Sequence, residues 1–487
     1  MVTKQIVKLG GRVFNAEGLH RAYTKTVYPE TPLYGASDWT AFALLQLADK
    51  LGVINELGSL YAESLPKIPK DGPPDMIYNP FYLNRKLDRV YDLPEVKVVD
   101  WRQPTINVMV PAFDFQSISA GFFGVFQIAR FLRSTGMPVR LVLFDTFVFS
   151  EKEARERIKG YHGLEDMFDE LEVEYIGERE KPLYVSSGDY NVATVWYSAY
   201  FARKVNEAIG RSKFLYLIQD YETVFHPANS MSTLADATYG WDYDALFSTK
   251  SLMDMFIKKD IGGYRTRGLR GIYFENACSS NLLPEFEFIA RHMDKPKKSL
   301  VFYSRPVVNR NMFELTALAL CEAYAQGIFD PEEWDCIGMG LGEGVVEILP
   351  GVYNTKLPRM TLKEYTDAIT DFDVCLTLMA SPHPSLIPMD LGGSGAVVVT
   401  NTFETKTPEY LESLNGNIIP VAPDLHAIVD GLREAVERSK DLVTRWQNAH
   451  DMQYPRTWEE TFSERHREFV KRWVSENENA DAKAGGQ

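Results

Sequence analysis

The sequence predicts an α/β protein built from two doubly wound, Rossmann-like domains. From Thr105 onward, short apolar runs alternate with helical segments, which is typical of a parallel sheet covered by helices. A polar stretch over residues 290–299 interrupts this alternation, and the same pattern then resumes. The chain has 487 residues, which is too long for one ordinary core. We therefore expect two sheet domains joined by a hinge.

The same patterns set the expected domain boundaries. A capped amphipathic segment after Ser37 and a Pro-rich stretch at residues 64–75 indicate a mainly helical N-terminal extension over residues 1–100. The first Rossmann-like domain is expected at residues 101–292 and the second at 293–452. A C-terminal helix is expected within 453–475, followed by a disordered tail at 476–487.

Apolar runs bounded by turn signals define the expected strands. In the first domain they lie at residues 106–113, 139–146, 171–177, 183–188, 213–218, 244–251 and 269–274. A helix is expected to begin near Asp189. In the second domain the strands are expected at 299–303, 334–340, 373–379, 396–400 and 417–422.

Composition excludes several classes of protein. A net charge of −15 argues against nucleic acid as a partner, because such binding needs a basic face. The four cysteines are scattered, which predicts reduced thiols in the cytoplasm. The N-terminus lacks the apolar segment of a signal peptide, and no apolar run is long enough to span a membrane. We expect a soluble, cytoplasmic protein.

Two arginines follow the first strand of the second domain. Arg305 and Arg310 lie where this strand gives way to a helix, which Asn309 is expected to cap near Asn311. Ligands of open α/β sheets bind at the carboxyl ends of the strands. Guanidinium groups beside a helix N-terminus suit a diphosphate, so we expect an anion site here.

A second motif, SPHPSLIPMDLGGSGAVVVTN at residues 381–401, combines a Pro-rich loop, an acid, a Gly-rich turn and a buried strand. Together with FYSRP, NRN and YLIQDYE (residues 216–222), it resembles the motifs of bacterial rhamnosyltransferases of the S-layer and O-antigen type. Those enzymes are GT-B glycosyltransferases, close to the large retaining family 4. The resemblance spans about residues 105–473.

The resemblance implies a GT-B fold whose first domain binds the acceptor and whose second binds a nucleotide sugar. It implies dTDP-rhamnose as donor, retention of configuration, no other cofactor, and a glycan or lipid-linked glycan as acceptor. Such an enzyme would work in the cytoplasm, with a peripheral contact at the inner face of the membrane through its acceptor. A role of the extension in forming a homo-oligomer stays open.

The resemblance also assigns residues. Arg305 and Arg310 would bind the diphosphate, Asp390 the ribose, and the backbone of Leu357 to Met360 the base, while His383 and Ser385 lie in the loop for the sugar. Asp220 and Glu222 follow a strand at its carboxyl end, so one could orient a hydroxyl as a general base, and at least one is expected to cap a turn. We assign Asp220, Glu222 and Arg305 as catalytic, and Asp114, Phe115 and Gly121 as acceptor contacts.

Two Asp-x-Asp pairs are candidate metal ligands. Asp242 and Asp244 form one, and Asp371 and Asp373 form the other. Each pair precedes a buried strand, whereas metal-binding acids of this type follow one, so we predict no catalytic metal. The alternatives left open are a UDP- or GDP-sugar as donor, or a nucleotide-sugar epimerase of the same fold.

Overall fold

The computed structural model describes residues 87, 90–111, 120–145, 149–161, 163–177, 179, 181–340, 344–358 and 360–484. The described residues all belong to one compact unit that begins at Leu87. The helical extension expected over residues 1–100 therefore lies almost wholly outside the described residues. Near its expected end, Val90 packs on Trp196, and both Leu93 and Val96 pack on the core of the first sheet domain.

The first domain contains a sheet of seven parallel strands in the order β4-β3-β2-β6-β7-β8-β9. These strands are β2 Ile106–Val110, β3 Val139–Leu143, β4 Glu172–Tyr175, β6 Tyr190–Ala193, β7 Phe214–Ile218, β8 Tyr243–Phe247 and β9 Arg270–Tyr273. Its helices are α6 Ala120–Arg133, α7 Glu151–Ile158, α8 Met167–Glu170, α9 Trp196–Ile209, α10 Ser230–Thr238 and α11 Lys250–Lys259, with short 3-10 turns η1 Glu222–Phe225 and η2 Ile261–Gly263. The predicted class of fold is confirmed.

One segment of this sheet differs from the prediction. The run expected as a sheet strand at residues 183–188 is β5, Leu183–Val185, which pairs instead with β1, Val96–Val98. The helix expected near Asp189 is replaced by strand β6. Asp189 does not cap a helix, because its carboxylate accepts hydrogen bonds from the Thr105 N–H (2.9 Å) and the Asn107 side chain (3.0 Å) inside the fold.

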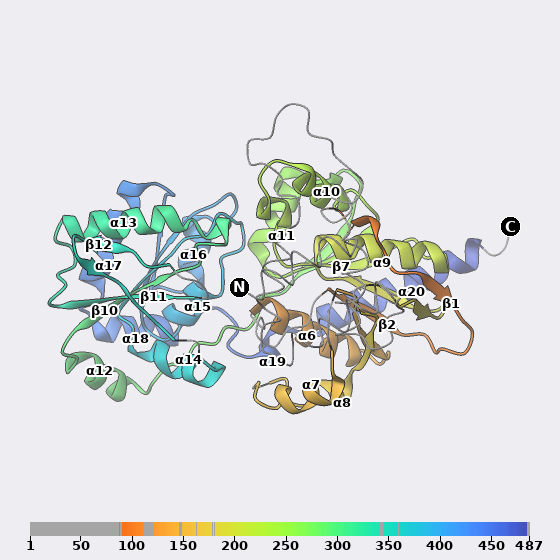
Figure 1. The fold of residues 1–487 in the computed structure, drawn as a ribbon, viewed down its shortest axis with the longest axis horizontal. Helices are drawn as coiled ribbons and strands as arrows, with labels where there is room; N and C mark the ends of the chain where they lie inside the picture. The colour runs from red at the N-terminus through yellow and green to blue at the C-terminus, as the bar shows by residue number, and fades with distance from the viewer. Residues whose placement is uncertain are drawn as a thin grey trace, which may run out of the picture. The chain divides into compact units, whose positions relative to one another are not determined.

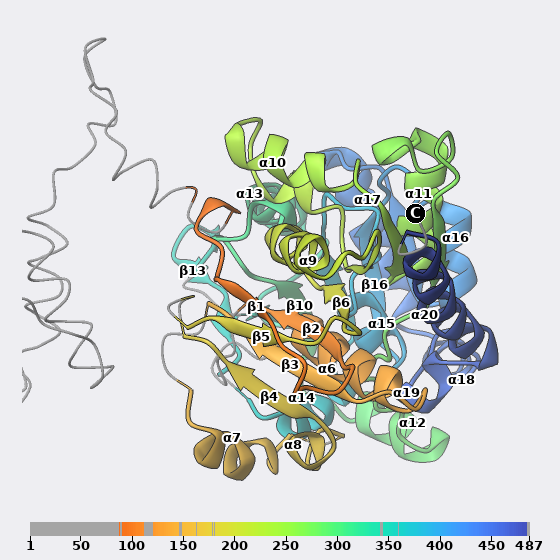
Figure 2. The same cartoon turned by 90° about the vertical axis from the view of Figure 1, so that its right-hand side faces the viewer.

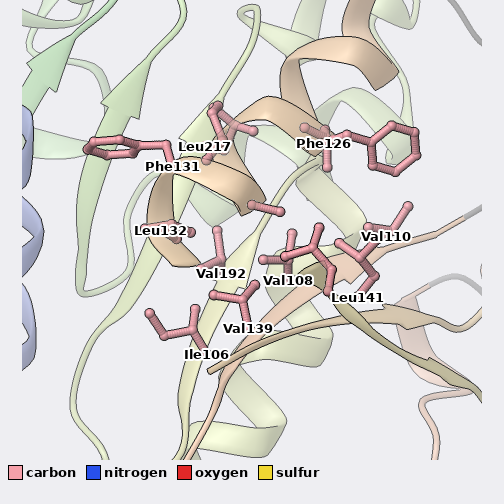
Figure 3. Close-up of a cluster of buried hydrophobic side chains, with 14 of the residues drawn as sticks. Ile106, Val108, Val110, Phe126, Phe131, Leu132, Val139, Leu141, Val192 and Leu217 are labelled. Atoms are coloured by element: carbon pink, nitrogen blue, oxygen red, sulfur yellow. The ribbon is translucent and has the colours of Figure 1, made fainter. Parts of the chain in front are cut away.

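Alternating side chains of the first sheet fill two separate cores. Ile106, Val108 and Val110 of β2 face α6, where they meet Phe126 and Leu132 (Figure 3). The intervening residue Met109 faces the opposite core, which α9 covers (Figure 2). This period of two is what a strand buried on both faces requires. The carboxyl ends of the strands remain available for polar loops.

The second domain contains a sheet of six parallel strands in the order β14-β11-β10-β15-β16-β17. These strands are β10 Lys298–Tyr303, β11 Trp334–Met339, β14 Thr355–Lys356, β15 Val374–Thr377, β16 Val397–Asn401 and β17 Ile418–Val421. Four of the helices are α12 Glu285–Met293, α13 Phe313–Ala325, α14 Leu362–Ala368 and α15 Ile387–Gly392, with 3-10 turns η3 Asn309–Asn311 and η4 Ile369–Asp371. The others are α16 Pro408–Leu414, α17 Leu425–Arg438 and α18 Leu442–His450. The antiparallel pair β12 Glu347–Leu349 and β13 Val352–Tyr353, and the edge strand β14, were not expected.

This second sheet is also buried on both faces. One core packs Leu300 and Phe302 of β10 against α13 and α17, which lie side by side (Figure 1). The other packs Val301 against α15 and α16, through Met389 and Leu411. The sheet is thus held rigidly between helices, and the loops at its carboxyl edge start from fixed positions.

The chain returns to the first domain at its end. α19, Trp458–Thr461, and α20, Glu464–Ala484, stand where one helix was expected over residues 457–473. Trp473 is fully buried in the core of the first domain, where its ring meets that of Tyr190 at 5.3 Å. Of the tail expected to be disordered, residues 476–484 continue α20, and residues 485–487 lie outside the described residues. None of the described helices is long and apolar enough to cross a membrane.

Candidate active site

Loops from the two domains meet in a polar cluster. Asp220 follows β7 of the first domain, while Arg310 and Ser381 follow β10 and β15 of the second. The hydroxyl of Ser381 donates a hydrogen bond to Asp220 Oδ1, and Arg310 Nε lies 3.6 Å from Asp220 Oδ2. Asp220 is only 6% exposed. The carboxyl edges of both sheets therefore converge on one carboxylate, at the position where open α/β sheets bind ligands.

Arg305 lies directly beyond β10. Its Nη1 donates a hydrogen bond to the hydroxyl of Tyr303 at 3.3 Å, but its Nε is buried without a hydrogen-bond partner. Gly340 covers the stem of this side chain: a Cβ there would lie 2.6 Å from the carbonyl oxygen of Ser304 and 3.0 Å from Arg305 Cγ. A buried guanidinium N–H without a partner is costly, and this geometry favours an anionic ligand.

Arg310 is held by a different local structure from the one expected. Asn309 does not cap a helix at Asn311; residues Asn309–Asn311 form η3, and α13 begins only at Phe313, after Met312 at a positive φ of 50°. The guanidinium of Arg310 lies 4.1 Å from the ring centre of Phe225, and its Nε makes no hydrogen bond. Arg310 therefore offers a second buried N–H at the same edge of the sheet.

The loop at residues 379–385 is fixed along most of its length. Asn401 holds Met379 by accepting its N–H (2.7 Å) and donating to its carbonyl oxygen (3.2 Å). The carbonyl of Arg310 accepts the N–H of Ala380 at 2.7 Å. This loop is therefore positioned from two neighbouring strands before any ligand binds.

His383 and Ser385 form a tight turn at the end of the same loop. The N–H of Ser385 donates to His383 Nδ1 at 2.9 Å, and Ser385 itself has a positive φ of 69°. Burial lowers the pKa of His383 to about 4, and Asp220 partly opposes this effect while Lys406 and Arg310 reinforce it. His383 is thus uncharged at neutral pH.

Of the two acids after β7, Glu222 caps a helix. Its carboxylate accepts the N–H of Trp196, the first residue of α9, and its own N–H donates to the hydroxyl of Tyr239 at 3.1 Å. Burial raises the pKa of Glu222 to about 8, so this carboxyl is mostly protonated at neutral pH. These contacts make Glu222 the acid that caps an element, while Asp220 is the acid that contacts Ser381 and Arg310. The catalytic role of Glu222 stays a prediction.

Asp390, expected at the ribose, is enclosed by protein groups. Its Oδ1 accepts the N–H of Ser279 at 2.6 Å, and its Oδ2 accepts the hydroxyl of Tyr365 at 2.9 Å. The side chain is 5% exposed, and burial raises its pKa to about 7. Asp390 thereby ties the connection between the domains to α15, and its contact with ribose stays a prediction.

We expect Asp390→Asn to flatten the dependence of stability on pH. The carboxyl holds its proton in the folded state up to about pH 7 but releases it near 3.8 when unfolded. The wild type therefore loses stability as the pH rises from 4 to 7, by a figure on the order of 4 kcal/mol at 1.36 kcal/mol per pH unit. Urea unfolding at pH 5 and pH 8 should show a smaller loss for the variant.

The exposed Asp367→Asn on α14 is the matched control and should keep the wild-type pH dependence. An Asp390→Asn protein that loses as much stability as the wild type between pH 5 and pH 8 would contradict the raised pKa of Asp390.

The remaining predicted contacts lie around this cluster or outside the described residues. Leu357 donates its N–H to the carbonyl of Gly338 at 3.0 Å, and Met360 is half-buried before α14. Gly121 lies in α6, where a Cβ would be 3.5 Å from Gln219 Oε1 at the end of β7. Asp114 and Phe115 lie outside the described residues. Ser381 and the buried Lys406 were not predicted, since only the fold shows that they face Asp220.

The Asp-x-Asp pairs have structural partners. Asp373 binds His292 Nδ1 (2.7 Å), Lys295 Nζ (2.7 Å) and Arg445 Nη1 (3.1 Å). Asp244 pairs with Arg270, and Asp242 with Arg267 at 2.6 Å. Within the described part of the chain, no three His, Cys, Asp or Glu side chains gather as metal ligands.

Solved structures share this fold. Two structures of Anabaena Alr3699/HepE, one in complex with UDP-glucose and one with UDP and glucose, match with TM-scores of 0.51 and 0.50. Each is 12% identical in sequence and covers 78% of this chain and 100% of its own. The two parallel sheets and these matches show the GT-B fold.

The family is shown by two matches along the chain. Family models of the N-terminal and C-terminal domains of WsaF match residues 105–250 and 298–433, in the same order and over more than half of the chain. The chain belongs to the WsaF family. It is also 27% identical over 378 residues to the O-antigen biosynthesis protein RfbC of Myxococcus xanthus, with 74% of this chain covered. The chain spans about a quarter of the length of that protein (26%).

Proposed function

We propose that this enzyme transfers a sugar from a nucleotide-activated donor, dTDP-rhamnose, to a growing glycan of the bacterial cell surface. Membership of the WsaF family and the similarity to an O-antigen biosynthesis protein support the glycan as acceptor. The resemblance of the FYSRP and SPHPS motifs to those of S-layer and O-antigen rhamnosyltransferases supports the donor.

The observation that carries the proposal is the pair of buried arginines. Arg305 and Arg310 both present an Nε that is buried without a hydrogen bond, at the carboxyl edge of one parallel sheet. A diphosphate would accept bonds from both groups and balance their charge. As the glycosidic bond breaks, negative charge grows on the departing diphosphate, so the same contacts lower the barrier.

The other roles follow from position. The loop at residues 379–385, which carries His383 and Ser385, faces the donor sugar, and the backbone of Leu357 to Met360 and the carboxyl of Asp390 contact the nucleoside. Asp220 can orient the acceptor hydroxyl once donor binding draws Arg310 toward the diphosphate. Gly121, beside Gln219, lies on the acceptor side of the cluster.

A thermal-shift series with dTDP, UDP and GDP tests the donor. A ligand present at a hundredfold its dissociation constant stabilises the folded state by about 2.7 kcal/mol, so dTDP should raise Tm by several degrees. Labelled dTDP-rhamnose should be consumed only when an acceptor glycan is added, and EDTA should leave the rate unchanged. A larger rise in Tm with UDP or GDP would reassign the donor. Turnover of the donor without an acceptor would indicate an epimerase. Loss of activity in EDTA that manganese restores would contradict a metal-free site.

A further inference from the structure

We propose that Lys406 is a positioning residue of this site, which anchors the loop at residues 379–385 and keeps His383 uncharged. The role rests on the proposed function, because that loop is the one assigned to the donor sugar. Lys406 itself is fully buried, and its ammonium group contacts the backbone of the loop.

The first argument is where the ammonium group lies. Lys406 follows β16 in a narrow turn, in which its N–H and carbonyl both bond to Phe403 (2.8 and 3.1 Å). Its Nζ donates to the carbonyl of Met379 at 3.0 Å, beside the amide of Asn401 on the same oxygen. A completely buried lysine is rare unless a specific contact requires it. Here the contact is the first residue of the loop.

The turn that carries Lys406 also touches the first domain. Thr405 donates its hydroxyl to the carbonyl of Ser251 at 2.6 Å, and Glu404 pairs with Lys259 at 2.6 Å. Both partners belong to α11. Both domains therefore hold the turn that anchors the loop at residues 379–385. A loop that served only the second domain would not need contacts with the first.

The second argument is the hydrogen bond inside the loop. Because His383 Nδ1 accepts the N–H of Ser385, the neutral ring must carry its hydrogen on Nε2. Protonation at Nδ1 would place two N–H groups against each other and open this turn. The shape of the loop thus depends on His383 remaining neutral.

Three charged groups face His383 from three elements. Asp220 after β7 favours the charged ring, whereas Lys406 after β16 and Arg310 in η3 oppose it. Burial also lowers the pKa of Lys406 to about 7, and Asp220 counteracts this effect, so the two groups belong to one cluster. When the cation at residue 406 is removed, only the charge of Arg310 still opposes the effect of Asp220 on His383. The pKa of His383 should therefore rise.

The test compares Lys406→Met with Lys259→Met. The second variant removes the same charge from a half-exposed lysine that pairs with Glu404 in the same turn. Histidine ring signals are followed by NMR from pH 5 to pH 8.5, and the His383 signal is assigned with His383→Gln. In the wild type and in Lys259→Met the signal should not titrate. In Lys406→Met it should titrate within this range, with a midpoint between about 5 and the ordinary 6.5.

Activity gives the consequence for the loop. In Lys406→Met, kcat/KM should fall between pH 8 and pH 5 as His383 gains a proton, with a roughly twofold loss at the midpoint found by NMR, while Lys259→Met follows the wild type. Lys406→Gln repeats the test if the methionine variant does not fold. A His383 signal that still does not titrate in Lys406→Met overturns the proposal. A signal that titrates without any effect on transfer would instead contradict the assignment of this loop to the donor.

Discussion

Arg305→Ala is expected to lower kcat/KM by about tenfold to a hundredfold, with most of the loss in kcat. A charge-assisted hydrogen bond to the diphosphate is worth roughly 1.5–3 kcal/mol, and each 1.4 kcal/mol is a factor of ten. The loss should fall on kcat because the diphosphate gains charge as the glycosidic bond breaks. Steady-state kinetics with saturating acceptor measures both constants.

The stability of the same variant separates function from folding. Because Arg305 Nε is buried without a partner, its removal should leave Tm unchanged or raise it. Arg305→Lys keeps the charge but loses the planar guanidinium group. Its kcat/KM should lie between those of the wild type and Arg305→Ala. The matched control is Arg438→Ala on α17, which breaks only an exposed ion pair with Glu434. Wild-type kinetics in Arg305→Ala would refute the diphosphate assignment.

Asp373→Ala should destabilise the protein by about 3–5 kcal/mol, because it leaves buried cationic groups without their carboxylate. His292, Lys295 and Arg445 all contact Asp373, whose side chain is almost fully buried. The neighbouring Asp371→Ala removes an acid that is 51% exposed and should cost no more than about 1 kcal/mol. Urea unfolding at pH 7.5 compares the free energies of unfolding of the two variants. Equal losses would contradict the structural role of Asp373 in balancing the buried cationic groups.

The effect of Asp373→Ala should shrink in acid. Burial alone would raise the pKa of Asp373, but the bond from His292 and the charges of Arg445 and Lys295 hold it well below its ordinary value of 3.8. The carboxylate therefore contributes its full stability above about pH 5, and the contribution falls as the pH drops below 4. The difference between wild type and variant should be smaller at pH 3.5 than at pH 7.5.

The sequence pattern predicted the sheets far better than the connections. Strands such as β7 and β16 are continuous apolar runs, and burial on both faces leaves no other structure for them. A helix is predicted to begin near Asp189, but strand β6 begins at the next residue, Tyr190. An acid at such a position often caps a helix, whereas the carboxylate of Asp189 binds elsewhere. The partners of Asp189 are Thr105, just before β2, and Asn107, within β2, and both are distant from it in sequence. Local signals cannot distinguish these two uses of one carboxylate.

In the candidate site, too, local sequence signals miss the residues that come together only through long-range contacts. Arg305 and Arg310 were predicted because they follow a strand directly, and the position of strand ends is a local property. Ser381 and Lys406 join the cluster only through contacts with Asp220 and Met379, across the domains or between neighbouring strands. Glu222 was predicted together with Asp220, but the turn η1 directs it to the start of α9.

The return of α20 to the first domain constrains the order in which the protein can be made. Val470 and Trp473 complete the core beneath β2 and β6, and Phe462 stacks on Phe131 of α6 at 4.2 Å. A ribosome releases these residues only after the whole second domain has been synthesised. The core of the first domain therefore stays incomplete, with part of the apolar face of its sheet exposed, until translation is nearly finished. Co-expression of the first domain with a separate peptide of α19 and α20 would shorten that wait and should increase its soluble yield.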